Sequence, residues 1–498
     1  MFSVNELRRN GVENEILQLS KHIEQGKSLQ YDIALNSLKT LDQKGIPSIE
    51  VLESLRAVLL KACQEGLNEK LKKEMDIIRN LCQTIITKYP VTTDVVNRMS
   101  SDVYELILTN LYPAESESTR LVSKSWGKAI PHAQIRAINS GKIRLKEALP
   151  SMSAHEIVDW LADNKAKKFL EFADFTGLEF DNYCLIKLTQ NCPNLKYLSI
   201  RSSKISEDAL KHLEHTPFLQ YLDIYCCQQL ETDALKHLKH TPFLQHLDIT
   251  CCDQLENDAL KHLEHTPFLQ YLDISCCQQL ETDALKYLIH TPRLLKLIMY
   301  LCTQLEPDGL KHLKHTPDLL YLGIISCSQL EPDALKHLKH TPDLLYLGIC
   351  WLDELGFDAL KYLKHTPNLK TLSIDGCDEL GTDALKHLKH TPNLKILSIG
   401  YCNELETDAL KYLIHTPHLL KLVMYLCTQL ETDALKHLKH TPFLQYLDIS
   451  KCNQLETDAL KHLKHTPFLQ YLDISECNQL DHDVNIDIRV QQGLSVKK

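Results

Sequence analysis

The feature that most constrains this chain is an internal repeat. The tripeptide His-Thr-Pro occurs at residues 215–217 and recurs every 25 residues up to 465–467, eleven times without an insertion. We call each 25-residue repeat a rung; its sequence approximates LQYLDIxxCxxLETDALKHLKHTPF. A fixed period of this length is typical of a solenoid, in which neighbouring repeats bury each other's apolar residues. The repeat therefore predicts one stacked array rather than about three separate globular domains.

Two apolar periods alternate within each rung. Leu222 and Ile224 alternate with outward residues, which is the period of a half-buried strand, whereas Leu235 and Leu238 follow helical spacing. Thr232 stands where a helix N-cap is expected, and the proline after His-Thr ends each helix because it has no N–H to donate. We expect strand, turn, short helix and turn. The predicted core positions are Leu219, Leu222, Ile224, Leu230, Leu235 and Leu238.

Stacking of such rungs predicts the fold class. Parallel strands about 4.8 Å apart on one side, with wider helices on the other, force an array to curve. We expect an α/β horseshoe solenoid with parallel strands on the concave face, short helices on the convex face and an all-α N-terminal region. The expected parts are a helical region at 1–90, a partner motif at 97–135, a solenoid cap at 143–190, about 12 repeats at 191–480 and a C-terminal tail or cap at 481–498.

The spacing Leu219-x-x-Leu222-x-Ile224-x-x-Cys227 resembles the cysteine-containing class of leucine-rich repeats. It recurs along the array, with Leu352 in place of the cysteine in one rung and Ser203 in the first. The resemblance covers about three-fifths of the chain. It implies that the thiol lies buried at the turn from strand to helix and bonds to the backbone.

A second motif precedes the array. An apolar stripe at Met99, Val103, Ile107, Leu108 and Leu111 is followed by LVSKSW at residues 121–126, and together they resemble an F-box. The resemblance implies that the stripe, with Val122 and Trp126, binds the adaptor subunit of an SCF ubiquitin ligase. Ser100 stands where that family prefers proline, and the acidic segment 115–119 replaces a leucine-containing one. The alternative is a helical segment that joins the N-terminal region to the solenoid.

Residues 1–90 have a helical pattern and carry a weaker resemblance. They faintly resemble the N-terminal bundle of transcription elongation factors and elongin A, but a generic helical bundle fits the pattern better. Ser153 and Glu156 form a capping box, which predicts a helix through residues 160–161, and residues 169–172 are a candidate strand of the cap.

Outward strand residues are predicted to line the concave face and bind a protein substrate. Aromatic side chains dominate interface energetics, and the rung containing Trp351, one of only three tryptophans, departs most from the repeat. The alternative for Trp351 is that it fills space beside the lost cysteine. The predicted substrate-binding residues are Tyr300, Tyr321, Ile325, Tyr346 and Trp351, with Tyr221, Asp223 and Tyr225 near the start of the array.

Cysteines and histidines recur at fixed positions of the rungs, and both residue types can ligate metal ions. Zinc sites bring ligands in close pairs, which a step of 25 residues does not supply, so we predict no metal or cofactor. The doublets at 226–227, 251–252 and 276–277 leave open oxidation or a soft metal, because one thiol of each doublet should leave the core. For His237 and His240 we expect bonding to carbonyls in the last helical turn, with acid below about pH 6.5 loosening the array.

Composition and motifs narrow the function. A net charge of −10 argues against a nucleic-acid footprint along the chain, and no uninterrupted apolar run is long enough for a membrane span. The charged N-terminus predicts no signal peptide, so a reducing compartment, cytoplasmic or nuclear, is expected. No phosphate loop or nucleophile elbow occurs, which predicts a non-enzyme.

The sequence thus favours a substrate-recognition subunit of a cullin-RING ubiquitin ligase, whose partners are the SCF adaptor, the cullin and an unknown protein substrate. The main alternative is an interaction scaffold with no ubiquitin link, whose N-terminal region binds other proteins such as transcription machinery. A metal- or redox-binding protein is the least favoured alternative.

Overall fold

The computed structural model describes residues 138–139, 145–149, 152–163, 165–327, 329–352, 356, 358–377, 379–480 and 494–497. The chain divides into two compact units, residues 1–173 and 174–498. The predicted region 1–90 and all seven predicted adaptor-binding residues lie outside the described residues, so those predictions stay predictions. The boundary between the units falls inside the predicted cap at 143–190.

Three helices are described in the first unit: α10 (Leu145–Ala148), α11 (Ala154–Asp163) and the 3₁₀ helix η1 (Lys165–Phe169). The capping box of α11 is confirmed, because the Ser153 N–H donates to Glu156 Oε2 at 2.8 Å and the Glu156 N–H donates to Ser153 Oγ at 3.3 Å. The expected strand at 169–172 starts later, as β1 (Phe172–Asp174), because η1 extends to Phe169.

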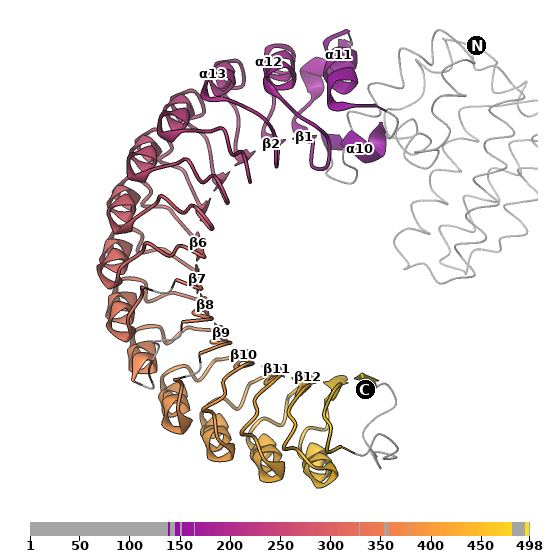
Figure 1. The fold of residues 1–498 in the computed structure, drawn as a ribbon, viewed down its shortest axis with the longest axis vertical. Helices are drawn as coiled ribbons and strands as arrows, with labels where there is room; N and C mark the ends of the chain where they lie inside the picture. The colour runs from indigo at the N-terminus through magenta and orange to yellow at the C-terminus, as the bar shows by residue number, and fades with distance from the viewer. Residues whose placement is uncertain are drawn as a thin grey trace, which may run out of the picture. The chain divides into compact units, whose positions relative to one another are not determined.

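Strands and helices alternate throughout the second unit, which curves into an arc with the strands inside and the helices outside (Figure 1). The strands are β2 (Tyr197–Ser199), β3 (Tyr221–Asp223), β4 (His246–Asp248), β5 (Tyr271–Asp273), β6 (Lys296–Tyr300), β7 (Tyr321–Ile325), β8 (Tyr346–Gly348), β9 (Thr371–Ser373), β10 (Ile396–Ser398), β11 (Lys421–Val423), β12 (Tyr446–Asp448), β13 (Tyr471–Asp473) and β14 (Ser495–Lys497).

The helices of this unit are short. They are α12 (Asn182–Asn191), α13 (Glu207–Leu210), η2 (Lys211–His215), η3 (Thr232–His240), η4 (Asn257–His265), η5 (Thr282–His290), η6 (Pro307–His315), η7 (Pro332–His340), η8 (Ala359–His365), η9 (Thr382–His390), η10 (Thr407–His415), η11 (Thr432–His440) and η12 (Thr457–His465). Within the described ranges, no helix combines the length and apolar character that crossing a membrane requires.

The strands form one parallel sheet in chain order, in register, so that Leu222 pairs with Leu247 and Leu247 with Leu272. The predicted core is confirmed, because Leu222 and the five other core positions of that rung are at most 2% exposed. At the C-terminal end, β14 pairs with β13, and Lys497 Nζ donates to Asp473 Oδ2 at 3.0 Å. The fold is therefore the predicted leucine-rich-repeat solenoid.

Threonines hydrogen-bond at both ends of the convex helix η3, but not in the way that the sequence predicted. Each of the 3₁₀ helices η2 to η12 ends where a fully buried threonine donates twice to one carbonyl: in η3, the Thr241 N–H and Oγ1 donate to Leu238 O at 2.9 and 3.1 Å. Nδ1 of His237 is buried without a hydrogen-bond partner among the described residues, so the expectation that His237 bonds these carbonyls through Nδ1 is wrong. At the helix start, Glu231 is the N-cap, and Thr232 Oγ1 instead accepts the Glu256 N–H of the next rung at 3.1 Å.

The cysteine column matches what the repeat class implies. The Cys252 thiol is fully buried and donates to Ile224 O in the preceding rung at 3.3 Å, and the same bond recurs along the array. The residue just before this column has a left-handed backbone, for example φ of 58° at Cys226. Its N–H donates to a carbonyl of the next rung, as the Cys226 N–H does to Thr250 O at 2.7 Å. We call this position the left-handed turn position.

Candidate functional site: the concave surface

A stack of rings lines the first strands of the array. Tyr197, Tyr221, His246 and Tyr271 occupy the same position in β2 to β5, and their successive ring centres are 3.9, 3.8 and 3.7 Å apart. Parallel register places equivalent side chains at the strand spacing, so planar rings stack face to face. Burial lowers the pKa of His246 to about 3, so its imidazole is neutral within the stack.

A basic side chain extends this row toward the middle of the array. Lys296 Nζ lies 5.1 Å from the ring centre of Tyr271 and 4.1 Å from that of Tyr321. The negative ring faces attract the ammonium group. Tyr346 continues the row, stacked on Tyr321 at 3.8 Å.

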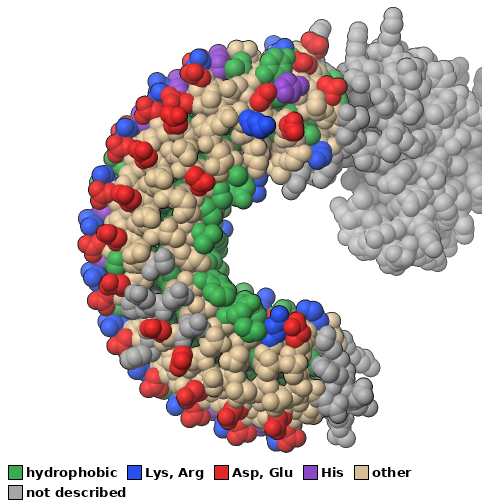
Figure 2. Space-filling view, in the orientation of Figure 1, with side chains coloured by type: hydrophobic (Ala, Val, Ile, Leu, Met, Phe, Trp, Pro, Cys, Tyr) green, Lys and Arg blue, Asp and Glu red, His purple; other side chains and the backbone are tan. Residues whose placement is uncertain are grey.

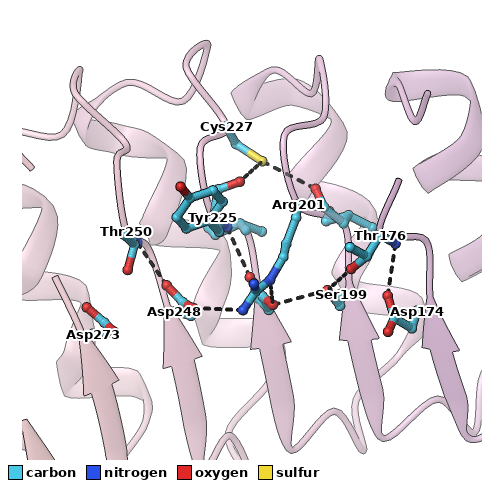
Figure 3. Close-up of polar contacts among 12 residues, drawn as sticks. Asp174, Thr176, Ser199, Arg201, Tyr225, Cys227, Asp248, Thr250 and Asp273 are labelled. Atoms are coloured by element: carbon cyan, nitrogen blue, oxygen red, sulfur yellow. Dashed lines mark hydrogen bonds and ion pairs between the residues drawn. The ribbon is translucent and has the colours of Figure 1, made fainter. Parts of the chain in front are cut away.

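Aspartates follow two positions later in the same strands, and they organise the surface from within. Asp223 Oδ1 and Asp248 Oδ1 accept the N–H of the residue two places on, at 3.1 and 3.0 Å. Arg201 bridges these two carboxylates, with Nε on Asp223 Oδ2 and Nη2 3.5 Å from Asp248 Oδ2 (Figure 3). Burial raises the pKa of Asp248 to about 6.

This arrangement corrects the expectation for Asp223. Its side chain is only 1% exposed and is committed to Arg201, Ser199 and the turn, so it offers a partner no free carboxylate. Arg201 is 42% exposed and also lies 5.4 Å from the ring centre of Tyr225. The charged group that a partner can reach near the start of the array is therefore the Arg201 guanidinium, which the buried Asp223 and Asp248 hold in place.

Aromatic rings at the centre of the array lie over glycines. A Cβ on Gly323 would meet the Tyr300 ring at 2.7 Å, and one on Gly348 would meet the Tyr346 hydroxyl at 3.0 Å. The hydroxyls of Tyr300 and Tyr321 are 3.3 Å apart. We call Tyr300, Tyr321 and Tyr346 the central tyrosine cluster; the absence of side chains beneath it lets the rings settle against the sheet.

Trp351 occupies the left-handed turn position, with φ of 54°, and its side chain is 43% exposed. It lies over Gly376, where a Cβ would come within 2.4 Å of the indole, and its ring centre is 4.8 Å from that of Tyr401. Leu352 takes the buried cysteine position and is 2% exposed. Trp351 therefore faces solvent rather than filling the space left by the cysteine.

The predicted substrate-binding residues fall into three groups. The central tyrosine cluster holds three of them, with Ile325 beside it through its register pair with Tyr300. Trp351 belongs to a neighbouring group with Tyr401, and Tyr221, Asp223 and Tyr225 lie several rungs away around Arg201. Figure 2 shows hydrophobic side chains gathered along the inner edge of the arc and charged ones along the outer edge.

Sequence reasoning missed two kinds of residue in this surface. Arg201 was overlooked although it lies 24 residues before Tyr225, the offset that relates the first rung to the second. The glycines at 323, 348 and 376 were also not identified as supports for the rings of this surface. Their pairing with aromatic side chains at nearby outward positions was the available signal.

No family model matches the chain, and no curated protein matches it. The yeast Rad7 chain, crystallised in complex with Elc1, is similar with a TM-score of 0.50 at 18% identity, covering 77% of this chain and 98% of that one.

Two further solved structures are more distant. Internalin InlF of Listeria monocytogenes has a TM-score of 0.46 at 15% identity, covering 69% of this chain and 94% of that one. A chain of the TLR13–ssRNA13 complex has a TM-score of 0.43 at 20% identity, covering 57% and 40%. At these identities the likeness concerns the fold alone. By its repeat, its core and its sheet, this chain is a leucine-rich-repeat protein.

Proposed function

We propose that this chain is a non-catalytic substrate-recognition subunit of an SCF-type cullin-RING ubiquitin ligase, whose concave surface binds a protein substrate. The observation that carries the binding role is the central tyrosine cluster seated over Gly323 and Gly348. Its rings are half-buried and held by their neighbours, so they lose little conformational freedom when a partner covers them.

The ubiquitin link rests on the F-box resemblance at residues 97–135. The fold neighbour Rad7 supports an adaptor-type partner, since it was crystallised with a second protein, Elc1. The cytoplasmic or nuclear location is part of the same proposal, and the buried thiols of the cysteine column, which donate to backbone carbonyls, fit a reducing compartment.

Binding of purified SCF adaptor to the full chain tests this link, with Elc1 as a second candidate adaptor in a parallel arm. We expect Trp126→Ala and Leu111→Ala each to weaken adaptor binding at least tenfold by calorimetry, since a few buried anchors carry most interface energy. Trp160→Ala, outside the motif, serves as the control. Absence of binding to either adaptor by the folded chain would leave the alternative, a scaffold without a ubiquitin link.

The substrate surface is tested separately by photo-crosslinking. A benzophenone side chain replaces Tyr346 on the concave face or Tyr362 on the convex helix η8, in cells where both variants are expressed equally. We expect a discrete crosslinked partner from Tyr346 only, competed by the unmodified full chain. Equal products from both positions would contradict a concave binding surface.

A further inference from the structure

The left-handed turn position carries thiols in three consecutive rungs. Cys226, Cys251 and Cys276 have φ values of 58°, 56° and 57°, and all three are free and partly exposed, unlike the buried cysteine that follows each of them. In the other rungs the position holds residues without a thiol: Ser202, Leu301, Ser326, Trp351, Gly376, Tyr401, Leu426, Lys451 and Glu476. The thiol cluster is therefore a local departure from the repeat.

Backbone hydrogen bonds hold the three thiols in register. Cys226 N donates to Thr250 O at 2.7 Å, Cys251 N to Ser275 O at 2.8 Å, and Cys276 N to Tyr300 O at 2.7 Å, in each case to the residue just before the next turn position. Equal φ values and equal bonding send the three side chains off in the same direction. They form a row at the strand spacing of about 4.8 Å, with Cys251 in the middle.

Cys251 lies beside two other titratable side chains. It is close enough to Cys276 and to the Tyr225 hydroxyl to raise the pKa of both groups. The charged groups that act on Cys276 are acidic, Asp253 and Asp273. Burial and the neighbouring thiol raise the pKa of Cys276 to about 12, so without a ligand this thiol stays protonated.

A straight row of thiols selects among metal ions by geometry. Two metal–sulfur bonds of about 2.3 Å placed end to end span about 4.6 Å, close to the spacing of neighbouring strands of about 4.8 Å. Because Cys226 and Cys276 are two strand spacings apart, one ion reaches only two thiols at once. Zinc requires four ligands, whereas soft Cu(I) accepts two thiolates in a line.

We propose that Cys251 and one neighbour, Cys226 or Cys276, form a two-coordinate site for a single Cu(I) ion. Each of the two thiols releases one proton and its sulfur lone pair binds the metal, so Cu(I) and two thiols give an anionic bis-thiolate complex and two protons, with no change of oxidation state. The site is independent of the proposed ligase role.

Because Cys251 lies in the middle of the row, every possible pair of neighbouring thiols contains it, and serine variants can test this. The full chain, reduced with a phosphine under nitrogen, is titrated with Cu(I) presented as its bis-bicinchoninate complex, and loss of the complex's absorbance counts the copper withdrawn. We expect Cys226→Ser and Cys276→Ser each to keep the site, because one pair remains. Cys251→Ser and the double variant C226S/C276S should each withdraw one equivalent of Cu(I) less from the bicinchoninate complex than the wild type does.

Serine already occupies this turn at Ser202 and Ser326, so these variants are expected to fold, and circular dichroism checks that they do. Ser326→Cys adds a thiol at the same turn between Leu301 and Trp351, and it should add no copper equivalent. Equal losses from all three single serine variants, or no loss from C251S, would overturn the proposal. So would a Cys251–Cys276 disulfide that persists in the phosphine and occupies both thiols.

Discussion

The convex and concave surfaces of the same array follow opposite rules. Helices η3, η9, η11 and η12 have one identical sequence, TDALKHLKH, whereas the strands range from YLD and HLD to KLIMY, YLGII and TLS. Both surfaces share one buried leucine core. The contrast teaches that the core and the turns maintain the arc, while the outward strand positions are free to carry specificity.

The strongest test of this contrast is at a concave glycine. Gly376→Ala places a Cβ within 2.4 Å of the Trp351 indole at a residue with φ of 70°. We expect a loss of about 1–3 kcal/mol in the free energy of unfolding, because both the left-handed backbone and the ring contact oppose a side chain. Urea unfolding followed by circular dichroism measures it.

Gly381→Ala is the matched control, since a Cβ there meets no atom within 4 Å and φ is −66°. That change should be neutral or slightly stabilising through the unfolded chain. If both glycines tolerate alanine equally, Trp351 is not held against the sheet as described.

A smaller effect is expected at the cation that bridges the buried aspartates. Arg201→Met leaves Asp223 and Asp248 without their shared partner, and buried carboxylates that lose a partner destabilise the fold. Because Arg201 is 42% exposed, solvent reduces the cost to on the order of 1 kcal/mol. Thermal unfolding at pH 7.5 measures it.

A convex ion pair provides the comparison for Arg201. Lys461 and Asp458 are 3.0 Å apart and both more than half exposed, so Lys461→Met should change stability by roughly 0–0.5 kcal/mol. A larger loss at Lys461 than at Arg201 would reverse the difference drawn between the two surfaces.

The sequence predicted the parts of this molecule that depend on period. Leu222 and Leu238 are buried because strand and helix periods place them in the core, and Cys252 is bonded as the repeat class implies. The capping by Thr241 and the left-handed turn were not predicted, since they depend on backbone torsions that hydrophobic spacing does not encode. Gly323 was not recognised as a support for Tyr300, because that contact joins neighbouring rungs rather than neighbours in sequence.

The convex histidines predict a collective response to acid. Desolvation is the first cause that lowers the pKa of fourteen of them, so unfolding frees groups that bind protons more readily. The unfolded chain takes up protons as the pH falls through about 6.5, so stability is full above that pH and is lost below it. We expect the melting temperature to fall by several degrees between pH 7.5 and 5.5.

One concave carboxyl acts in the opposite direction. The pKa of Asp248 is raised to about 6, so its protonation in acid favours the folded state. As a single group against fourteen, it reduces the fall without reversing it. A melting temperature that is constant over this range would show that the histidines are as exposed as in the unfolded chain.

The smallest expected effect separates the histidine rungs from the tyrosine rungs. Tyr287, Tyr362 and Tyr412 occupy the first histidine slot of their helices, and each hydroxyl donates to an aspartate of the preceding rung, as Tyr362 does to Asp333 at 2.8 Å. His337 occupies the same slot, and its Nδ1 is buried with no hydrogen-bond partner in the described part of the chain. Asp308 is its equivalent acceptor, 29 residues earlier.

His337→Tyr should therefore raise the melting temperature slightly at pH 7.5 and more at pH 5.5, because it adds a hydrogen bond and removes one protonation site. His337→Phe removes the same site without the hydroxyl, so the difference between the two variants measures the bond to Asp308. Equal melting temperatures for both variants would mean that this hydrogen bond adds no stability to a convex surface that the repeat already holds.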